Sequence, residues 1–63
     1  MEADEIVKKL KATPYKFTLA NEVRREVKKL DDYDFRLLKV DLRRQMLKTE
    51  NAGISKAIAQ IIN

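Results

Sequence analysis

Residues 19–30, LANEVRREVKKL, give the clearest indication of the fold. At about 100° per residue, the apolar side chains of this stretch fall within roughly 100° of arc, the arginines and lysines cover the far side, and the two glutamates lie along one edge. The stretch therefore predicts an amphipathic helix with a narrow face in a core and a cationic face outside. The apolar positions are Leu19, Ala20, Val23, Val27 and Leu30.

The remainder of the chain also favours helices, because only one proline and one glycine interrupt it. Residues 3–12 place acids in the first turn and lysines in the last turns, an arrangement that the helix dipole favours. A third helix is expected over about 35–50, with Asp32 or Asp34 as its N-cap.

The segment after residue 50 predicts the end of one helix and the start of another. Gly53 suits the left-handed conformation that ends many helices, and Ser55 suits the N-cap of a last helix. We therefore expect an all-α fold in one domain, residues 1–63. The bundle would contain three main helices and a short C-terminal helix, and it would be dimeric.

Residues 15–19, YKFTL, follow the only proline and alternate apolar with polar side chains. This pattern allows a short strand. It equally allows a loop whose Tyr15 and Phe17 enter the core. In either case Thr18 or Asn21 is the expected N-cap of the helix that follows.

A short strand followed by an amphipathic helix, here YKFTL and then ANEVRREVKKL, resembles the start of a ribbon-helix-helix repressor. The resemblance covers residues 16–50 and implies that paired strands from two subunits enter the major groove of DNA. It also implies that Lys16 and Thr18 point at bases while Tyr15, Phe17 and Leu19 pack inward. The chain departs from the family in having LDDYD where a glycine-containing turn is usual, and in having an additional helix at each end.

The composition argues against catalysis and metal binding. Cysteine and histidine are both absent, which removes disulfides, the usual zinc ligands and the commonest general base. No hydroxyl lies in a nucleophile-elbow or phosphate-loop pattern. Turn formation and helix capping explain the acidic cluster Asp31, Asp32 and Asp34, which lacks the spacing of a calcium loop. We expect no enzymatic activity, no metal site and no cofactor.

Location and assembly follow from the distribution of apolar residues. No apolar run approaches the roughly 20 residues of a membrane span, and the N-terminal MEADE is acidic where a secretory signal is positive. We expect a cytoplasmic protein without membrane association. A chain of 63 residues without disulfides also needs reinforcement, from oligomerisation or from an unusually apolar core, and we expect a homodimer.

The helix expected over residues 35–50 is apolar on two sides, which predicts packing on both. One seam contains Phe35, Leu38, Leu42 and Met46, and the other contains Leu37, Val40 and Leu47.

Isoleucines close to residue 63 remain ordered only if they dock, against an earlier helix or across a subunit interface. The residues expected at a partner or dimer interface are Leu37, Val40, Leu47, Ile58, Ile61 and Ile62.

The basic helix faces are the candidate functional site. The formal net charge is +4, and rows of cations one helical turn apart suit the phosphates of nucleic acid. We therefore expect a small DNA-binding protein that regulates transcription. The expected nucleic-acid contacts are Arg24, Arg25, Lys28, Lys29, Lys16, Arg36, Lys39 and Arg43.

Three alternatives remain open. The cations can form an ordinary solvated face, with Glu22 and Glu26 paired to Arg25 and Lys29 three residues on. The chain can instead be a small adapter or inhibitor that uses its apolar helices to bind an acidic partner protein. A structural component of a ribonucleoprotein would combine features of both.

Overall fold

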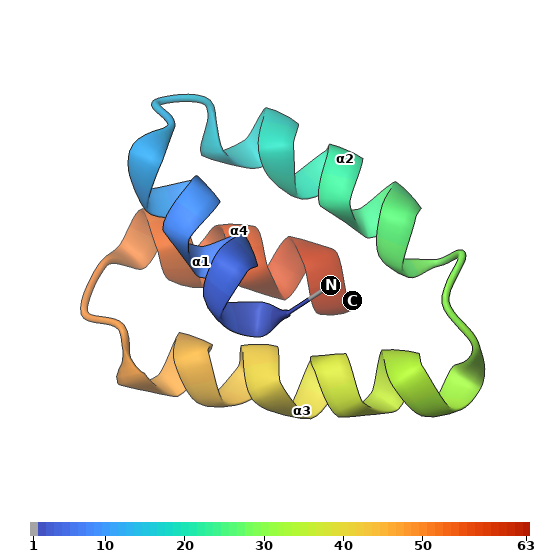
Figure 1. Ribbon diagram of the computed structural model, residues 1–63. Helices are drawn as coiled ribbons and strands as arrows, with labels where there is room; N and C mark the ends of the chain where they lie inside the picture. The colour runs from blue at the N-terminus through green and yellow to red at the C-terminus, as the bar shows by residue number, and fades with distance from the viewer. Residues whose placement is uncertain (1) are drawn as a thin grey trace.

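The computed structural model describes residues 2–63, which form four helices joined by short loops (Figure 1). No strand occurs in this range. The predicted all-α class and helical bundle are therefore confirmed. The helices are α1 (Ala3–Ala12), α2 (Lys16–Val27), α3 (Asp32–Lys48) and α4 (Ala52–Ile62).

Helix α4 occupies the centre of the bundle. In Figure 1, α2 and α3 lie on opposite sides, α1 crosses in front and α4 lies behind. Helix α4 packs against all three other helices and most extensively against α2 and α3. Its buried side chains are Ile54, Ala57, Ile58, Ile61 and Ile62.

The core is made of one apolar stripe from each helix. Helix α1 contributes Ala3, Ile6, Val7 and Leu10, as its spacing dictates. Helix α2 contributes Ala20, Val23 and Val27, and helix α3 contributes Leu38 and Leu42. Leu19, Leu30, Phe35 and Met46 are partly buried and pack against these residues.

Residues 15–19 differ from both expectations, because they form the start of α2 rather than a strand or a plug. Tyr15 occupies the N-cap position, its side chain is 72% exposed, and Phe17 is 49% exposed. Thr18 lies inside the helix and caps nothing. A lone strand would leave backbone groups unpaired, whereas a helix satisfies them locally. The strand required by a ribbon-helix-helix arrangement is therefore absent from the described residues, and the predicted Thr18 and Asn21 caps are wrong.

The caps of α3 and α4 also differ from those predicted. The Asp31 carboxylate accepts a hydrogen bond from the Asp34 backbone N–H at 2.8 Å, so α3 starts at Asp32. The Asn51 side chain accepts from the Ile54 N–H at 3.1 Å, so α4 starts at Ala52. Gly53 is therefore helical with a negative φ, and it is not a left-handed stop.

Candidate nucleic-acid interface

The cationic face of α2 is only partly neutralised. Lys29 Nζ lies 3.4 Å from Glu26 Oε1, which confirms one of the two ion pairs expected for a solvated helix. The expected pair between Glu22 and Arg25 does not form, and the Lys29–Glu26 pair is the sole salt bridge within residues 2–63. The remaining cations of α2 are therefore without an acidic partner in this range.

The two edges of α2 face different neighbours. The Gln60 side-chain amide of α4 donates to Asn21 and to the Phe17 carbonyl oxygen, the latter at 3.4 Å. This edge therefore borders α4. On the other edge, Glu22 and Glu26 line a shallow hollow together with Lys9 of α1.

One row of side chains follows the α4 edge of α2. Phe17, Asn21, Arg24 and Lys28 succeed one another at spacings of four and three residues, which places them on one side of a helix. The last three and Arg25 line an open hollow of about 380 Å³. Arg24 is half-buried, and its Nε has no hydrogen-bond partner within residues 2–63.

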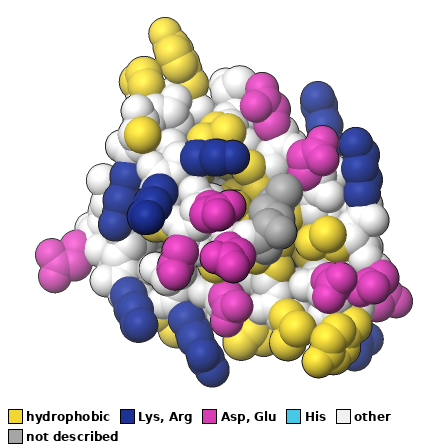
Figure 2. Space-filling view, in the orientation of Figure 1, with side chains coloured by type: hydrophobic (Ala, Val, Ile, Leu, Met, Phe, Trp, Pro, Cys, Tyr) yellow, Lys and Arg dark blue, Asp and Glu magenta, His cyan; other side chains and the backbone are white. Residues whose placement is uncertain are grey.

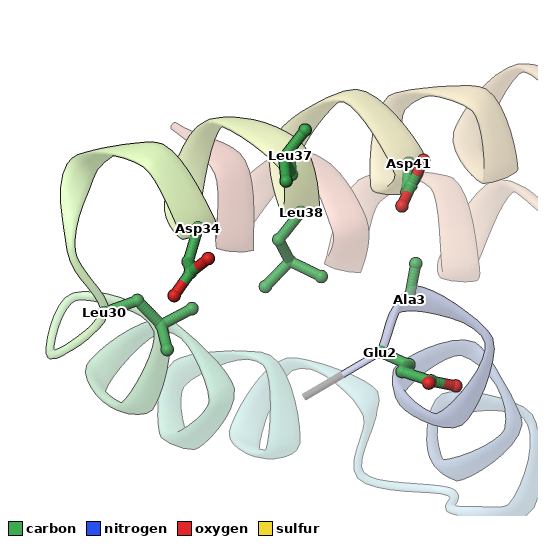
Figure 3. A pocket seen from close by; sticks show the side chains of 7 residues that line it. All are labelled: Glu2, Ala3, Leu30, Asp34, Leu37, Leu38 and Asp41. Atoms are coloured by element: carbon green, nitrogen blue, oxygen red, sulfur yellow. The ribbon is translucent and has the colours of Figure 1, made fainter.

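Helix α3 also has an acidic edge toward α1. Gln45 Nε2 donates to the Asp4 carboxylate of α1 at 2.8 Å. Asp34 and Asp41 lie on the same edge and face the start of α1 across an open hollow of about 340 Å³ (Figure 3). The hollow is lined by Glu2, Ala3, Leu30, Asp34, Leu37, Leu38 and Asp41.

The basic row of α3 lies on the edge away from α1. Arg36, Lys39 and Arg43 are separated by three and four residues, and at about 100° per residue they lie opposite the edge that carries Gln45. This is the α4 side of α3. Lys39 is half-buried, and its Nζ lies 5.0 Å from the centre of the Phe35 ring, a cation–π contact that restrains the side chain.

The structure thus brings both basic rows to the side of the molecule that is centred on α4. Lys56 lies between them, because it projects from α4 opposite the buried Ile54, Ile58 and Ile61 and is itself exposed. We call this surface the α4 face. It comprises Arg24, Arg25 and Lys28 of α2, Lys56 of α4, and Arg36, Lys39 and Arg43 of α3.

Most acidic side chains occupy a different part of the surface, although Asp32 lies four residues before Arg36 on the same edge of α3. Figure 2 shows acidic side chains over α1 and near the start of α3, on the side that Figure 1 turns to the viewer, with lysine and arginine side chains among them. The α4 face lies on the reverse side, because the basic row of α2 borders α4 and the basic row of α3 lies on the edge away from α1. The α4 face therefore carries an excess of cations, whereas the α1 side carries charges of both signs.

Two predicted contact residues lie apart from the α4 face. Lys16 is half-buried and its ammonium donates to the Thr13 carbonyl at 2.9 Å. Since Thr13 is the C-cap of α1, this bond satisfies a terminal carbonyl and complements the helix dipole. Lys29 is turned toward the Glu26 edge of α2 and is paired there.

Two features on or beside the α4 face do not follow from the sequence expectations. The alternation of residues 15–19 predicts a buried Phe17, yet this side chain is half-exposed at the head of the α2 row. Lys56 belongs to neither of the basic rows that the sequence predicts. Its position opposite the isoleucines of α4 is a helical-wheel signal that identifies it as outward-facing.

The six residues predicted for a partner interface separate into two groups. Leu37 and Val40 are each 50% exposed and Leu47 is 79% exposed, so the second seam of α3 faces outward and is not packed within residues 2–63, and its predicted place at an interface stays a prediction. Ile58, Ile61 and Ile62 are buried within the chain itself, and they offer no surface to a partner.

Two kinds of site are absent from residues 2–63. No group of three or more carboxylates is arranged to hold a metal ion. No helix in that range combines the length and the hydrophobicity needed to cross a bilayer. Comparison of the chain with family models, curated proteins and solved structures finds no match.

Proposed function

We propose that the protein is a non-enzymatic nucleic-acid-binding protein that contacts phosphates through the α4 face. One observation carries the proposal. Cations from three helices share this face without an acidic partner within residues 2–63, and most of the acidic side chains lie elsewhere on the molecule. Such segregation directs a phosphate backbone to one surface, where each neutralised phosphate releases counterions.

The α2 row adds a means of contacting bases. Phe17 is 49% exposed and lies on the same edge of α2 as Arg24 and Lys28. An aromatic ring beside a line of cations suits unpaired bases, which stack on the ring while the backbone follows the charges. The packed stem of Arg24 also lowers the entropy cost of holding its terminal nitrogens toward a ligand.

We retain the regulatory role on DNA that the sequence led us to expect, but we assign the contact with DNA to a different surface of the protein. In a ribbon-helix-helix protein a strand reads the bases. Here the corresponding residues are helical, and the α4 face takes the place of that strand.

Binding is tested by fluorescence anisotropy with labelled duplex DNA, single-stranded DNA and single-stranded RNA at several salt concentrations. We expect affinity to fall steeply with salt, with a slope of about −0.7 to −0.9 per phosphate contact. The Lys28→Glu/Lys56→Glu variant should lower the affinity at least about tenfold and reduce the slope by about two contacts.

The matched control is Lys8→Glu/Lys11→Glu, which changes the net charge equally but on α1, where both lysines are exposed. This control should bind much more tightly than the Lys28/Lys56 variant. Equal losses in the two variants would mean that only overall charge matters, and no binding at low salt would refute the proposal.

The adapter alternative has one supporting observation. Leu37, Val40 and Leu47 expose an apolar seam on α3 that the bundle leaves uncovered within residues 2–63. Since the isoleucines of α4 are buried, α3 alone would provide the docking surface.

A further inference from the structure

The outer seam of α3 has the spacing of a coiled-coil contact. Tyr33, Leu37, Val40 and Leu47 are separated by four, three and seven residues, and Arg44 occupies the position between the last two. Tyr33 is 70% exposed, and the three aliphatic side chains are 50–79% exposed. These four residues, which we call the outer seam, are therefore not packed by the other helices within residues 2–63 and are available to a second helix.

The charges along this seam reverse from one end of α3 to the other. Asp34 and Asp41 lie beside its first half, on the edge toward α1, and Lys48 follows on the same edge at the end of the helix. Arg44 lies within the second half of the seam. On this edge a reversed copy places Asp34 beside Lys48 at each end, whereas Asp41 comes opposite its own copy at the centre, where the neighbouring Arg44 side chains supply the opposite charge.

We propose that the outer seam of α3 binds the outer seam of a second copy of the chain, with the two helices antiparallel. In this register Leu37 of each copy packs against Leu47 of the other. Asp34 lies beside the partner subunit's Lys48. Asp41 lies near Asp41 of the partner subunit, and the partner subunit's Arg44 is within reach to offset that repulsion. The twofold symmetry forms each of these contacts twice.

A parallel pairing instead sets the two different edges of α3 against each other, which brings Arg36 beside Asp41 of the partner subunit but Arg43 beside Lys48 of the partner subunit. Residues with the same number then face each other, so Arg44 meets Arg44 inside the apolar seam. The antiparallel register instead places Arg44 against Val40, where its aliphatic stem covers the valine and its head reaches Asp41. Arg44 therefore selects the orientation.

The antiparallel pairing also affects the α4 face. Arg36 and Arg43 border the outer seam on the α4 side, and antiparallel helices keep equivalent edges on the same side of the pair. Arg43 then lies near Arg43 of the partner subunit, a repulsion that an anion bound there would relieve. The two α4 faces would form one surface. This consequence rests on the proposed function, whereas the pairing itself does not.

The first test is sedimentation velocity without nucleic acid, across the micromolar range. A contact confined to one helix is small, below about 1,200 Å² of buried surface, so we expect a reversible monomer–dimer equilibrium. Leu47→Ser should weaken association at least about tenfold, because the residue is used twice. The control Tyr15→Ser removes a similarly exposed apolar side chain outside α3 and should leave association unchanged.

The second test determines orientation. The chain contains no cysteine, so Leu37→Cys and Leu47→Cys each introduce a single thiol. In an oxidised mixture of the two variants, the disulfide that joins position 37 of one copy to position 47 of the other should exceed either homodisulfide about tenfold, because only that pair brings the thiols within bonding distance. A predominant disulfide between two copies of the Leu37→Cys variant would establish a parallel pair and overturn the proposed register. A chain that stays monomeric throughout the concentration range would overturn the pairing itself.

Discussion

Asp31 and Asn51 show how single residues determine where helices begin. Each side chain accepts a hydrogen bond from the backbone N–H three residues later, and each thereby satisfies one of the donors that a helix start leaves free. The sequence offers three aspartates in the 31–34 turn, and any of them has the chemistry of a cap. Asp31 makes the capping bond, and Asp32 and Asp34 fall in the first turn of α3, where the helix dipole favours their charges.

Replacing Asp31 tests this assignment. Asp31→Ala should lower the free energy of unfolding by about 1 kcal/mol, because the Asp34 N–H loses its acceptor. Urea denaturation followed by circular dichroism measures the change. Asp32→Ala is the control, and it should cost clearly less because Asp32 makes no capping hydrogen bond within residues 2–63. Equal losses would contradict the assignment of the cap.

At the scale of one element, α3 contains two apolar seams with opposite environments. Leu42 is 1% exposed in the core, whereas Leu47 on the outer seam is 79% exposed. Periodicity predicted both seams, since residues three or four apart share a side of any helix. It could not say which seam faces the core, because both are apolar. Packing against α4 decided that.

The same substitution in both seams separates their roles. Leu42→Ala should lower the free energy of unfolding by about 2–5 kcal/mol, because it removes buried contacts and leaves a cavity. Leu47→Ala should change it by less than about 0.5 kcal/mol. Chemical denaturation at a concentration where the chain is monomeric measures both. A large loss for Leu47→Ala under that condition would show that its side chain packs within the monomer.

For the whole molecule, stability depends on α4, which supplies five of the fourteen buried core residues in the described range. A chain of this size has little stability to spare, about 3–5 kcal/mol. A single substitution in α4 that lowers the free energy of unfolding by several kcal/mol therefore removes nearly all of the stability.

Ile61→Ala is the corresponding prediction. Ile61 is 1% exposed, so its truncation should cost about 2–5 kcal/mol and leave much of the population unfolded at room temperature. Asn63→Ala, at an exposed position two residues later, should leave stability unchanged. Far-ultraviolet circular dichroism, which reports helix content, compares the two variants as a function of temperature. Retention of a cooperative transition near that of the parent chain in Ile61→Ala would contradict the central role of α4.

The amino-acid sequence by itself determined the helical class, the core stripe of residues 19–30 and the two seams of α3. These depend on side-chain spacing along one helix, which is a local property. Only the tertiary structure decided that α2 begins at Lys16, that Phe17 is exposed, that Lys16 caps α1, and that the isoleucines of α4 are buried within the chain. It also decided that the cations of α2 and α3 share the α4 face with Lys56. Each of these depends on how helices distant in sequence pack together, and no local pattern carries that information.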